Sequence, residues 1–147
     1  MGLDRAFDIS VSGLDAARMQ QEIVASNLAN IDATRTSTGG PYRRQILILG
    51  EKQLAFSDIL ESEMQKAYRG KLSGGVEVVD IMDDPTPFQK VYKPGHPDAD
   101  AEGYVSMPNV SMAKEMVDMV YASKLYQANI MAFNATKKMA QDTLQLP

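Results

Sequence analysis

The sequence predicts an α+β protein in which long N- and C-terminal helices pack as a coiled-coil-like pair, with a small antiparallel β module between them. Three observations lead to this fold class. Apolar residues near the N-terminus recur at alternating steps of four and three, and the C-terminal quarter contains a long run without Gly or Pro. Between them lie short β-rich runs bounded by Gly, Pro and Asp. The predicted segments are residues 1–33, 34–108 and 109–147, and the two helices together form one discontinuous domain.

The N-terminal helix is predicted from an apolar seam. Its positions are Leu3, Phe7, Ser10, Leu14, Ala17, Gln21, Val24, Leu28 and Ile31. This spacing places all of them on one side of a helix, with polar breaks at Ser10 and Gln21. Gly13 weakens such a helix by about 1 kcal/mol relative to Ala. We therefore expect packing against another helix or another subunit to stabilise it.

The C-terminal helix is expected to start after Ser111, as its N-cap, and to continue to about Leu146. It carries two apolar stripes. The first consists of Met112, Met116, Met119, Tyr126, Ile130, Phe133, Ala140 and Leu144, and the second of Val117, Val120, Leu125, Ala128, Ala132, Ala135 and Met139. Because a partner helix in the same chain covers only one side, the two stripes predict contacts with other subunits.

Short strands are predicted in the middle of the chain. They span residues 42–49, 76–82, 88–92 and 103–105, with a turn at residues 83–87. Residues 51–73 are ambiguous, because their apolar spacing fits an amphipathic helix and their composition fits a mobile segment equally well.

Composition argues against several function classes. The formal net charge is −4 and the chain has no Cys, which disfavours a phosphate-binding basic surface, disulfides and thiol chemistry. His96 is the only histidine, so no nucleophile, base and orienting group can be assembled. We expect no enzymatic activity, no cofactor, no bound metal, no small-molecule substrate and no nucleic-acid partner. The N-terminus lacks the apolar block of a secretion signal, and no apolar run approaches the ~18–20 residues of a membrane span.

Three local motifs have simple structural interpretations. The acidic run at 98–102 imitates the first half of a calcium-binding loop, but Asn109 stands where that loop needs a bidentate carboxylate. We therefore expect a solvated acidic loop. His96 is expected to hydrogen-bond its neighbours in a turn. Arg43 and Arg44 are interpreted as charges at a strand edge that favour solubility.

Several stretches resemble one protein family. Residues 7–18 (FDISVSGLDAAR) and 24–34 (VASNLANIDAT) resemble the N-terminal motif of flagellar rod, hook and related axial proteins. Residues 91–110 (VYKPGHPDADAEGYVSMPNV) are similar to the flagellar basal-body rod family, and within it to the proximal-rod FlgC type. The C-terminal runs at 126–129 and 133–135 agree with this resemblance. Ala33 departs from it, since many relatives carry Asn there.

The resemblance implies a structural subunit of the bacterial flagellar basal-body rod, which self-assembles through its terminal helices into the axial drive shaft. It implies export through the flagellar type III apparatus without a Sec signal and a location in the rod that spans the periplasm. The implied partners are other rod proteins, the inner-membrane ring and rod-base proteins, and further copies of the chain. A soluble helical adaptor or export chaperone of a secretion system is the alternative.

We expect the assembly contacts to come from the seam, the stripes and the Pro-rich segment. The residues are Leu3, Phe7, Leu14, Val24, Asn27, Leu28, Asn30, Ile31, Pro94, Gly95, Pro97, Met116, Met119, Tyr126, Asn129, Ile130, Phe133 and Leu144. Asn27 and Asn30 either form interhelical hydrogen bonds that fix the register or cap the end of the helix. Residues 94–108 are expected to set the geometry between the β module and the last helix.

The terminal helices are expected to be poorly ordered in the exported monomer and to pair at the growing end of the rod. Burial of the apolar stripes between subunits then offsets the entropy of ordering the chain.

Overall fold

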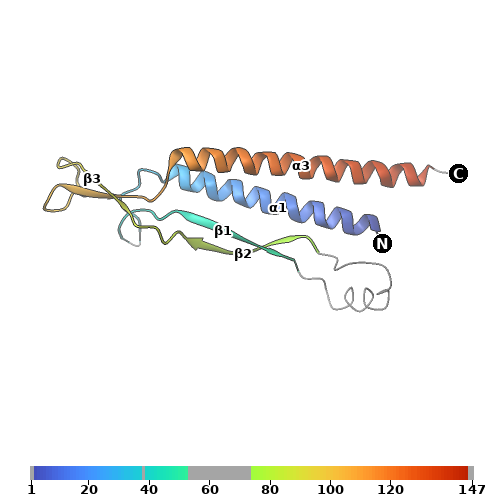
Figure 1. Cartoon of the computed structure of the whole chain (residues 1–147), viewed down its shortest axis with the longest axis horizontal. Helices are drawn as coiled ribbons and strands as arrows, with labels where there is room; N and C mark the ends of the chain where they lie inside the picture. The colour runs from blue at the N-terminus through green and yellow to red at the C-terminus, as the bar shows by residue number, and fades with distance from the viewer. Residues whose placement is uncertain (1, 38, 53–73, 146–147) are drawn as a thin grey trace. The chain divides into compact units, whose positions relative to one another are not determined.

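The computed structural model describes residues 2–37, 39–52 and 74–145 (Figure 1). Its elements, in chain order, are α1 (Gly2–Ala29), β1 (Gln45–Glu51), β2 (Val76–Asp83), β3 (Gln89–Tyr92), β4 (Tyr104–Met107) and α3 (Met112–Leu144). The predicted α+β class is confirmed. The ambiguous segment 51–73 lies outside the described residues from position 53 onward.

Both terminal helices end within a few residues of the predicted positions. At the end of α1, Asn30 Nδ2 donates a hydrogen bond of 2.9 Å to the carbonyl of Ser26. Ser111 precedes α3, and its carbonyl accepts the N–H of Glu115 at 2.9 Å, so Ser111 occupies the predicted N-cap position. In the described part of the chain, neither helix is apolar over a stretch long enough to cross a membrane.

The β-rich middle forms two separate two-stranded sheets, β1 with β2 and β3 with β4. Strands β3 and β4 are antiparallel, with Gln89 opposite Met107 and Tyr92 opposite Tyr104. The two tyrosine rings pack edge to face, with centroids 5.3 Å apart. The predicted turn between β2 and β3 is stabilised by Asp84, whose Oδ1 accepts the N–H of Thr86 at 2.9 Å. Each sheet therefore pairs two strands that are consecutive in the chain.

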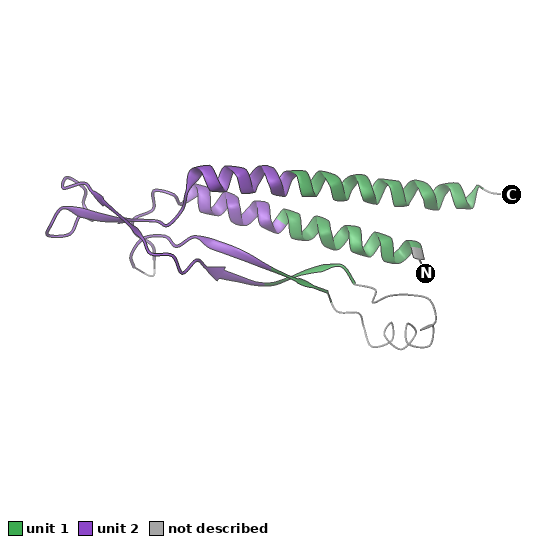
Figure 2. Ribbon diagram, viewed as in Figure 1, with its two compact units in different colours: residues 1–18, 49–79, 124–147 green, residues 19–48, 80–123 purple. Residues whose placement is uncertain are grey.

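The chain divides into two compact units, one of residues 1–18, 49–79 and 124–147 and the other of residues 19–48 and 80–123 (Figure 2). We call them the first and the second unit. Each unit combines parts of α1 and α3 with strand residues. The predicted grouping of the two helices into one discontinuous domain stays a prediction.

In the first unit, α1 contacts both α3 and the start of β2. The rings of Phe7 and Phe133 pack edge to face at 5.0 Å. A Cβ atom on Gly13 would lie 2.8 Å from Asn129 Oδ1, so a side chain at this position would force the Asn129 amide to move. On a different side of α1, Ser12 Oγ accepts the N–H of Val76 at 3.2 Å.

In the second unit, α1 again lies between α3 and a strand. Gln21 Nε2 donates to Ser123 Oγ at 3.1 Å, and Asn27 Nδ2 donates to Glu115 Oε2 at 3.1 Å. Partner numbers in α3 fall as those in α1 rise, here and in the first unit, so the helices are antiparallel. Every position of the predicted α1 seam is buried or half-buried, which confirms that seam as the covered side of the helix.

Candidate assembly site

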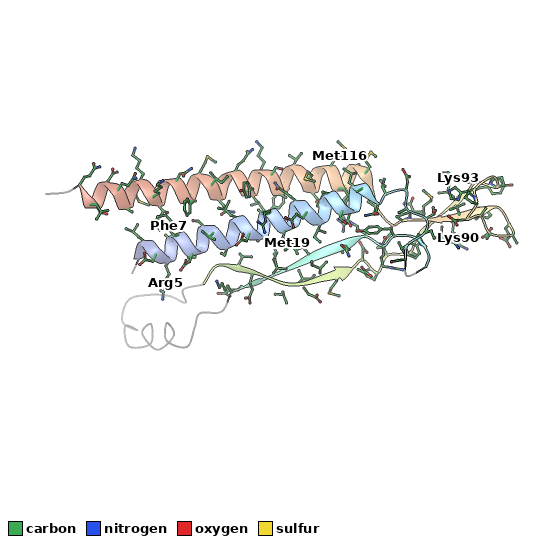
Figure 3. The ribbon with its side chains drawn as sticks, turned by 180° about the vertical axis from the view of Figure 1, so that it is seen from behind. Arg5, Phe7, Met19, Lys90, Lys93 and Met116 are labelled. Atoms are coloured by element: carbon green, nitrogen blue, oxygen red, sulfur yellow. The ribbon has the colours of Figure 1, made fainter. Side chains whose placement is uncertain are left out.

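One face of α3 in the second unit exposes large apolar side chains. We call it the outer patch of α3. It consists of Met112, Met116, Val117, Val120 and Tyr121, which are 54%, 57%, 67%, 60% and 57% exposed. Met112, Met116 and Val120 follow one another at steps of four residues, and so do Val117 and Tyr121. All five therefore lie on one half of the helical surface. Met116 lies on the side of α3 away from α1, whereas Phe7 lies between the two helices (Figure 3).

The covered side of α3 is a second line with alternating steps of four and three. Its residues are Glu115, Met119, Ala122, Tyr126, Asn129, Phe133, Thr136 and Ala140, all buried or half-buried. This line is shifted from the predicted first stripe, because it includes polar residues that a search for apolar spacing leaves out. Met119, Tyr126 and Phe133 therefore face inward, while Met116, Ile130 and Leu144 are exposed.

The other predicted site residues divide in the same way. On α1, Val24 is buried, and Leu3, Phe7, Leu14 and Leu28 are half-buried, as is Ile31 just after the helix. Pro94, Gly95 and Pro97 are exposed in the loop that joins β3 to β4. The link from β4 to α3 consists of residues 108–111 alone, so the prolines at 94 and 97 do not lie in the connection to α3 where we expected them to act. A role in assembly stays a prediction for all of these residues.

On the side of α3 opposite the outer patch, the second unit contains a largely buried polar cluster. We call it the polar junction, and it consists of Asn27, Tyr42, Arg44, Asp84, Asn109, Glu115 and Asp118. Asn27 is fully buried, and its Nδ2 donates to the carbonyl of Gln45 at 2.9 Å and to Glu115 Oε2 at 3.1 Å. Its Oδ1 accepts the N–H of Gln45 at 2.9 Å and the hydroxyl of Tyr42 at 3.0 Å.

These contacts decide between the two expected roles of the asparagines. Asn27 forms the interhelical hydrogen bond and also binds the first residue of β1. Asn30 instead caps the end of α1 through the carbonyl of Ser26.

Arg44 is the charged centre of the polar junction. Its Nε donates to Glu115 Oε1 at 2.6 Å, and one terminal nitrogen donates to Asp118 Oδ2 at 3.1 Å. The other terminal nitrogen lies 3.5 Å from Asp84 Oδ2. The Arg44 side chain is only 10% exposed and that of Glu115 is fully buried. The interpretation of Arg44 as a solubility charge at a strand edge is therefore wrong, because its charge is used inside the fold.

Burial alone would lower the pKa of Arg44, but the hydrogen bond and charge of Glu115, together with Asp118 and Asp84, raise the pKa above its ordinary value. The neighbouring Arg43 has a different environment. Its guanidinium lies 4.4 Å from the centre of the Phe88 ring and donates to the carbonyl of Asp84 at 2.9 Å.

Asn109, in the link before α3, connects the polar junction to Thr86 in the turn after β2. Asn109 Oδ1 accepts the N–H of Arg44 at 2.8 Å, and its Nδ2 donates to Thr86 Oγ1 at 2.9 Å. Hydrogen bonds from the Thr86 hydroxyl and N–H, with a smaller contribution from the charge of Arg44, lower the pKa of Asp84. The polar junction thus joins the end of α1, the approach to β1, the turn after β2 and the start of α3.

The single histidine and the acidic loop have local structural roles. His96 Nδ1 accepts the N–H of Asp98 at 3.2 Å, as expected for a turn residue. Asp98 Oδ2 accepts the hydroxyl of Thr34 at 2.8 Å, and Asp100 Oδ1 accepts the N–H of Tyr104 at 2.8 Å. Across the described ranges, His, Asp and Glu residues form no group of three that could hold a metal ion.

Apolar periodicity missed the polar junction because its members are polar. The sequence does contain a signal for the covered side of α3. Glu115, Ala122, Asn129 and Thr136 are each seven residues apart and therefore share one side of the helix, whatever their polarity.

Both terminal segments of the chain match the sequence profiles of flagellar protein families. Residues 7–35 match the sequence profile described as "Flagella basal body rod protein", and residues 101–146 match "Flagellar basal body rod FlgEFG protein C-terminal". The chain is 43% identical to "Flagellar basal-body rod protein FlgC" of Bacillus subtilis (strain 168), over 96% of this chain and 95% of that protein. It is 42% identical to the protein of the same name in Yersinia enterocolitica and 41% identical to that of Escherichia coli O157:H7, in each case over 99% of this chain and 98% of the relative.

Proposed function

The chain belongs to the FlgC family of flagellar basal-body rod proteins and is a structural subunit of that rod, and we propose that it joins its neighbours through the outer patch of α3. Family membership places the protein in the flagellar basal-body rod, in association with other rod components. It also favours a rod subunit over the adaptor or export chaperone that the sequence left as the alternative.

The observation that carries the proposed contact is the exposure of the outer patch. Five large apolar side chains on one helix face are each more than half exposed. Monomeric proteins rarely leave such contiguous apolar surface in water unless it meets a partner. Two of the five are methionines, whose flexible side chains adapt to partner surfaces of different shape. A subunit that contacts several kinds of rod protein benefits from that adaptability.

The polar junction supports the same proposal from inside the subunit. It connects the first turns of α3 to α1, to the start of β1 and to the turn after β2 through hydrogen bonds of 2.6–3.2 Å. Because Arg44 binds Glu115 and Asp118 directly, the side of α3 opposite the outer patch is held in one rotation. The outer patch is thus presented in a defined orientation, as a repeating assembly requires.

The proposal extends to further copies of this chain and the inner-membrane ring and rod-base proteins as partners, and to delivery by the flagellar type III export apparatus into the periplasm-spanning rod. It also includes terminal helices that are not fully ordered in the exported monomer and complete their ordering on assembly. The exposed apolar side chains of α3 support this last point, since their burial becomes available only when a neighbour is present.

The test is a chain with Met116→Glu and Val120→Glu, expressed in cells that lack the wild-type gene. Both side chains are exposed, so we expect the helical circular dichroism of the purified protein to stay unchanged. We expect the variant to be absent from detergent-resistant basal bodies and the cells to be non-motile. Gln127→Glu, at another exposed position of α3, is the matched control and should assemble normally. Normal basal bodies containing the double variant would refute the proposed contact.

A further inference from the structure

The exposed side of α1 is a narrow stripe with an excess of negative charge. Its residues are Asp4, Asp8, Val11, Asp15, Arg18, Glu22, Ala25 and Ala29. Ile9 is exposed on a different side of the helix, and the other described side chains of α1 are buried or half-buried. The stripe therefore carries four acidic side chains and one basic side chain. An exposed line of one sign attracts a partner of the opposite sign.

The exposed side of α3 has the opposite charge. Its exposed charged residues are Lys114, Lys124, Lys137, Lys138 and Asp142, four basic and one acidic. The remaining acidic side chains of α3 are Glu115 and Asp118, and both bind Arg44 in the polar junction. Because Glu115 and Asp118 are paired with Arg44, the exposed charge of α3 comes mainly from its lysines and is positive.

Within the first unit, the charged residues of each helix are separated by a multiple of seven residues. On α1, Asp8 and Asp15 are seven residues apart. On α3, Lys124 and Lys138 are fourteen residues apart, with the exposed Met131 midway between them. Seven residues span about 10.5 Å of helix and return to nearly the same side.

Of these charged residues, Asp8, Asp15, Lys124 and Lys138 have no ion-pair partner within the part of the chain that the structure describes. Their charges are thus not neutralised by an intrachain partner among those residues. A neighbouring subunit can supply that partner.

We propose that the acidic stripe of α1 in one copy, through Asp8 and Asp15, docks against the lysine line of α3, which consists of Lys124 and Lys138, in a second copy. Opposite charges on one side of each helix, seven residues apart on α1 and fourteen apart on α3, favour such a contact, with Val11 and Met131 as apolar side chains beside the charges. The partner is another copy of this chain because both complementary surfaces lie on it. The inference rests on the proposed function and adds a specific pair of surfaces to it.

The contact is heterologous, because different surfaces of the two copies meet. Each added copy then leaves one α1 stripe and one α3 line free for the next copy. A contact of this kind generates a ring or a helical array, whereas a self-complementary contact would stop at a dimer.

Charge reversal tests the docking in the purified full-length chain by sedimentation, with helical circular dichroism as the check on folding. We expect wild-type self-association to weaken as salt is raised from about 20 mM to about 500 mM. A chain with Asp8→Lys and Asp15→Lys should associate about 30-fold more weakly, and so should a chain with Lys124→Glu and Lys138→Glu.

Recombining the reversed surfaces separates docking from general charge effects. An equal mixture of the two reversed chains should regain association, and so should one chain that carries all four substitutions. Reversals that leave association unchanged, or a mixture that does not regain it, would overturn the inference. A wild-type chain that stays monomeric at low salt would also overturn it, because a charge-driven contact is strongest there.

Cysteine cross-linking identifies the surfaces directly, since the chain has no Cys of its own. Mixed chains carrying Val11→Cys or Met131→Cys should form a disulfide between the two kinds of chain. A preference of Val11→Cys chains for one another would indicate a symmetric contact and refute the inference.

The variants also separate this inference from the proposed function. If charge reversal has no effect while Met116→Glu with Val120→Glu blocks rod assembly, the inference fails and the outer patch stands. If the outer-patch variant assembles normally, the proposed function of the patch fails whatever the charge variants do.

Discussion

Replacing Arg44 by Met removes the positive centre of the polar junction while keeping a long, unbranched side chain. Glu115 would then be a fully buried carboxylate whose remaining hydrogen bond comes from Asn27 at 3.1 Å. Asp118 would lose a contact of 3.1 Å, and Asp84 would lose a charge 3.5 Å away. The folded state would therefore contain negative charge without a counter-charge, and most of that charge lies out of water.

The size of the effect follows from this geometry. Breaking a buried ion pair by removing one partner costs about 3–5 kcal/mol, because the other charge stays buried and unpaired. Domains unfold with a free energy of about 5–15 kcal/mol. Arg44→Met should thus remove a large part of the stability and lower the melting temperature by about 10 °C.

Urea denaturation followed by far-UV circular dichroism measures this loss of unfolding free energy. Adding Glu115→Gln to Arg44→Met removes the buried charge and should restore about 2 kcal/mol. Arg43→Met is the matched control, since Arg43 lies against the Phe88 ring and a backbone carbonyl, and it should cost about 1 kcal/mol or less. Equal losses from the two arginine substitutions, or no recovery in the double variant, would show that the polar junction does not depend on the charge of Arg44.

Three further predictions concern the packing of α1 and the acid stability of the protein. Gly13→Ala should gain little or destabilise on its own, because its Cβ would lie 2.8 Å from Asn129 Oδ1, but in an Asn129→Ala background it should stabilise by about 1 kcal/mol in thermal unfolding. Asn27→Asp should destabilise at neutral pH, because the introduced carboxylate faces that of Glu115, and denaturation at lower pH should show partial recovery as the pair takes up a proton. The lowered pKa of Asp84 contributes stability above its unfolded pKa of about 3.8, and this stability is lost as pH falls through the lower folded pKa. Asp84→Asn should therefore flatten the acid limb of the stability profile.

The outcomes that contradict these predictions are distinct. Additive effects in the Gly13 and Asn129 cycle would mean that the two residues do not touch in solution. A constant cost of Asn27→Asp at all pH values would exclude carboxylate repulsion as its cause. For Asp84, Thr86→Val is the companion variant, because it removes the hydroxyl that donates to Asp84 Oδ1 at 2.7 Å. It should flatten the same acid limb, and an unchanged limb in both variants would refute the assignment.

The sequence alone determined the fold class and the covered side of α1. Both follow from local rules, since a repeat of four and three residues places Leu14, Ala17 and Val24 on one side of a helix whatever covers it. Gly, Pro and Asp likewise limit the strands to positions that turn chemistry predicts, and the observed strand ends lie within three residues of the predicted ones. The N-cap position of Ser111 was predictable for the same reason.

Only the tertiary structure decided which side of α3 faces inward and what Arg44 does. The covered line of α3 contains Glu115, Asn129 and Thr136, and such polar side chains become acceptable inside only when partners from distant parts of the chain satisfy them. Those partners for Glu115 are Asn27 and Arg44, 88 and 71 residues away in the sequence. Apolar burial depends mainly on spacing along one element and can be predicted from it. Burial of charge depends on the three-dimensional meeting of several elements, which local periodicity does not encode.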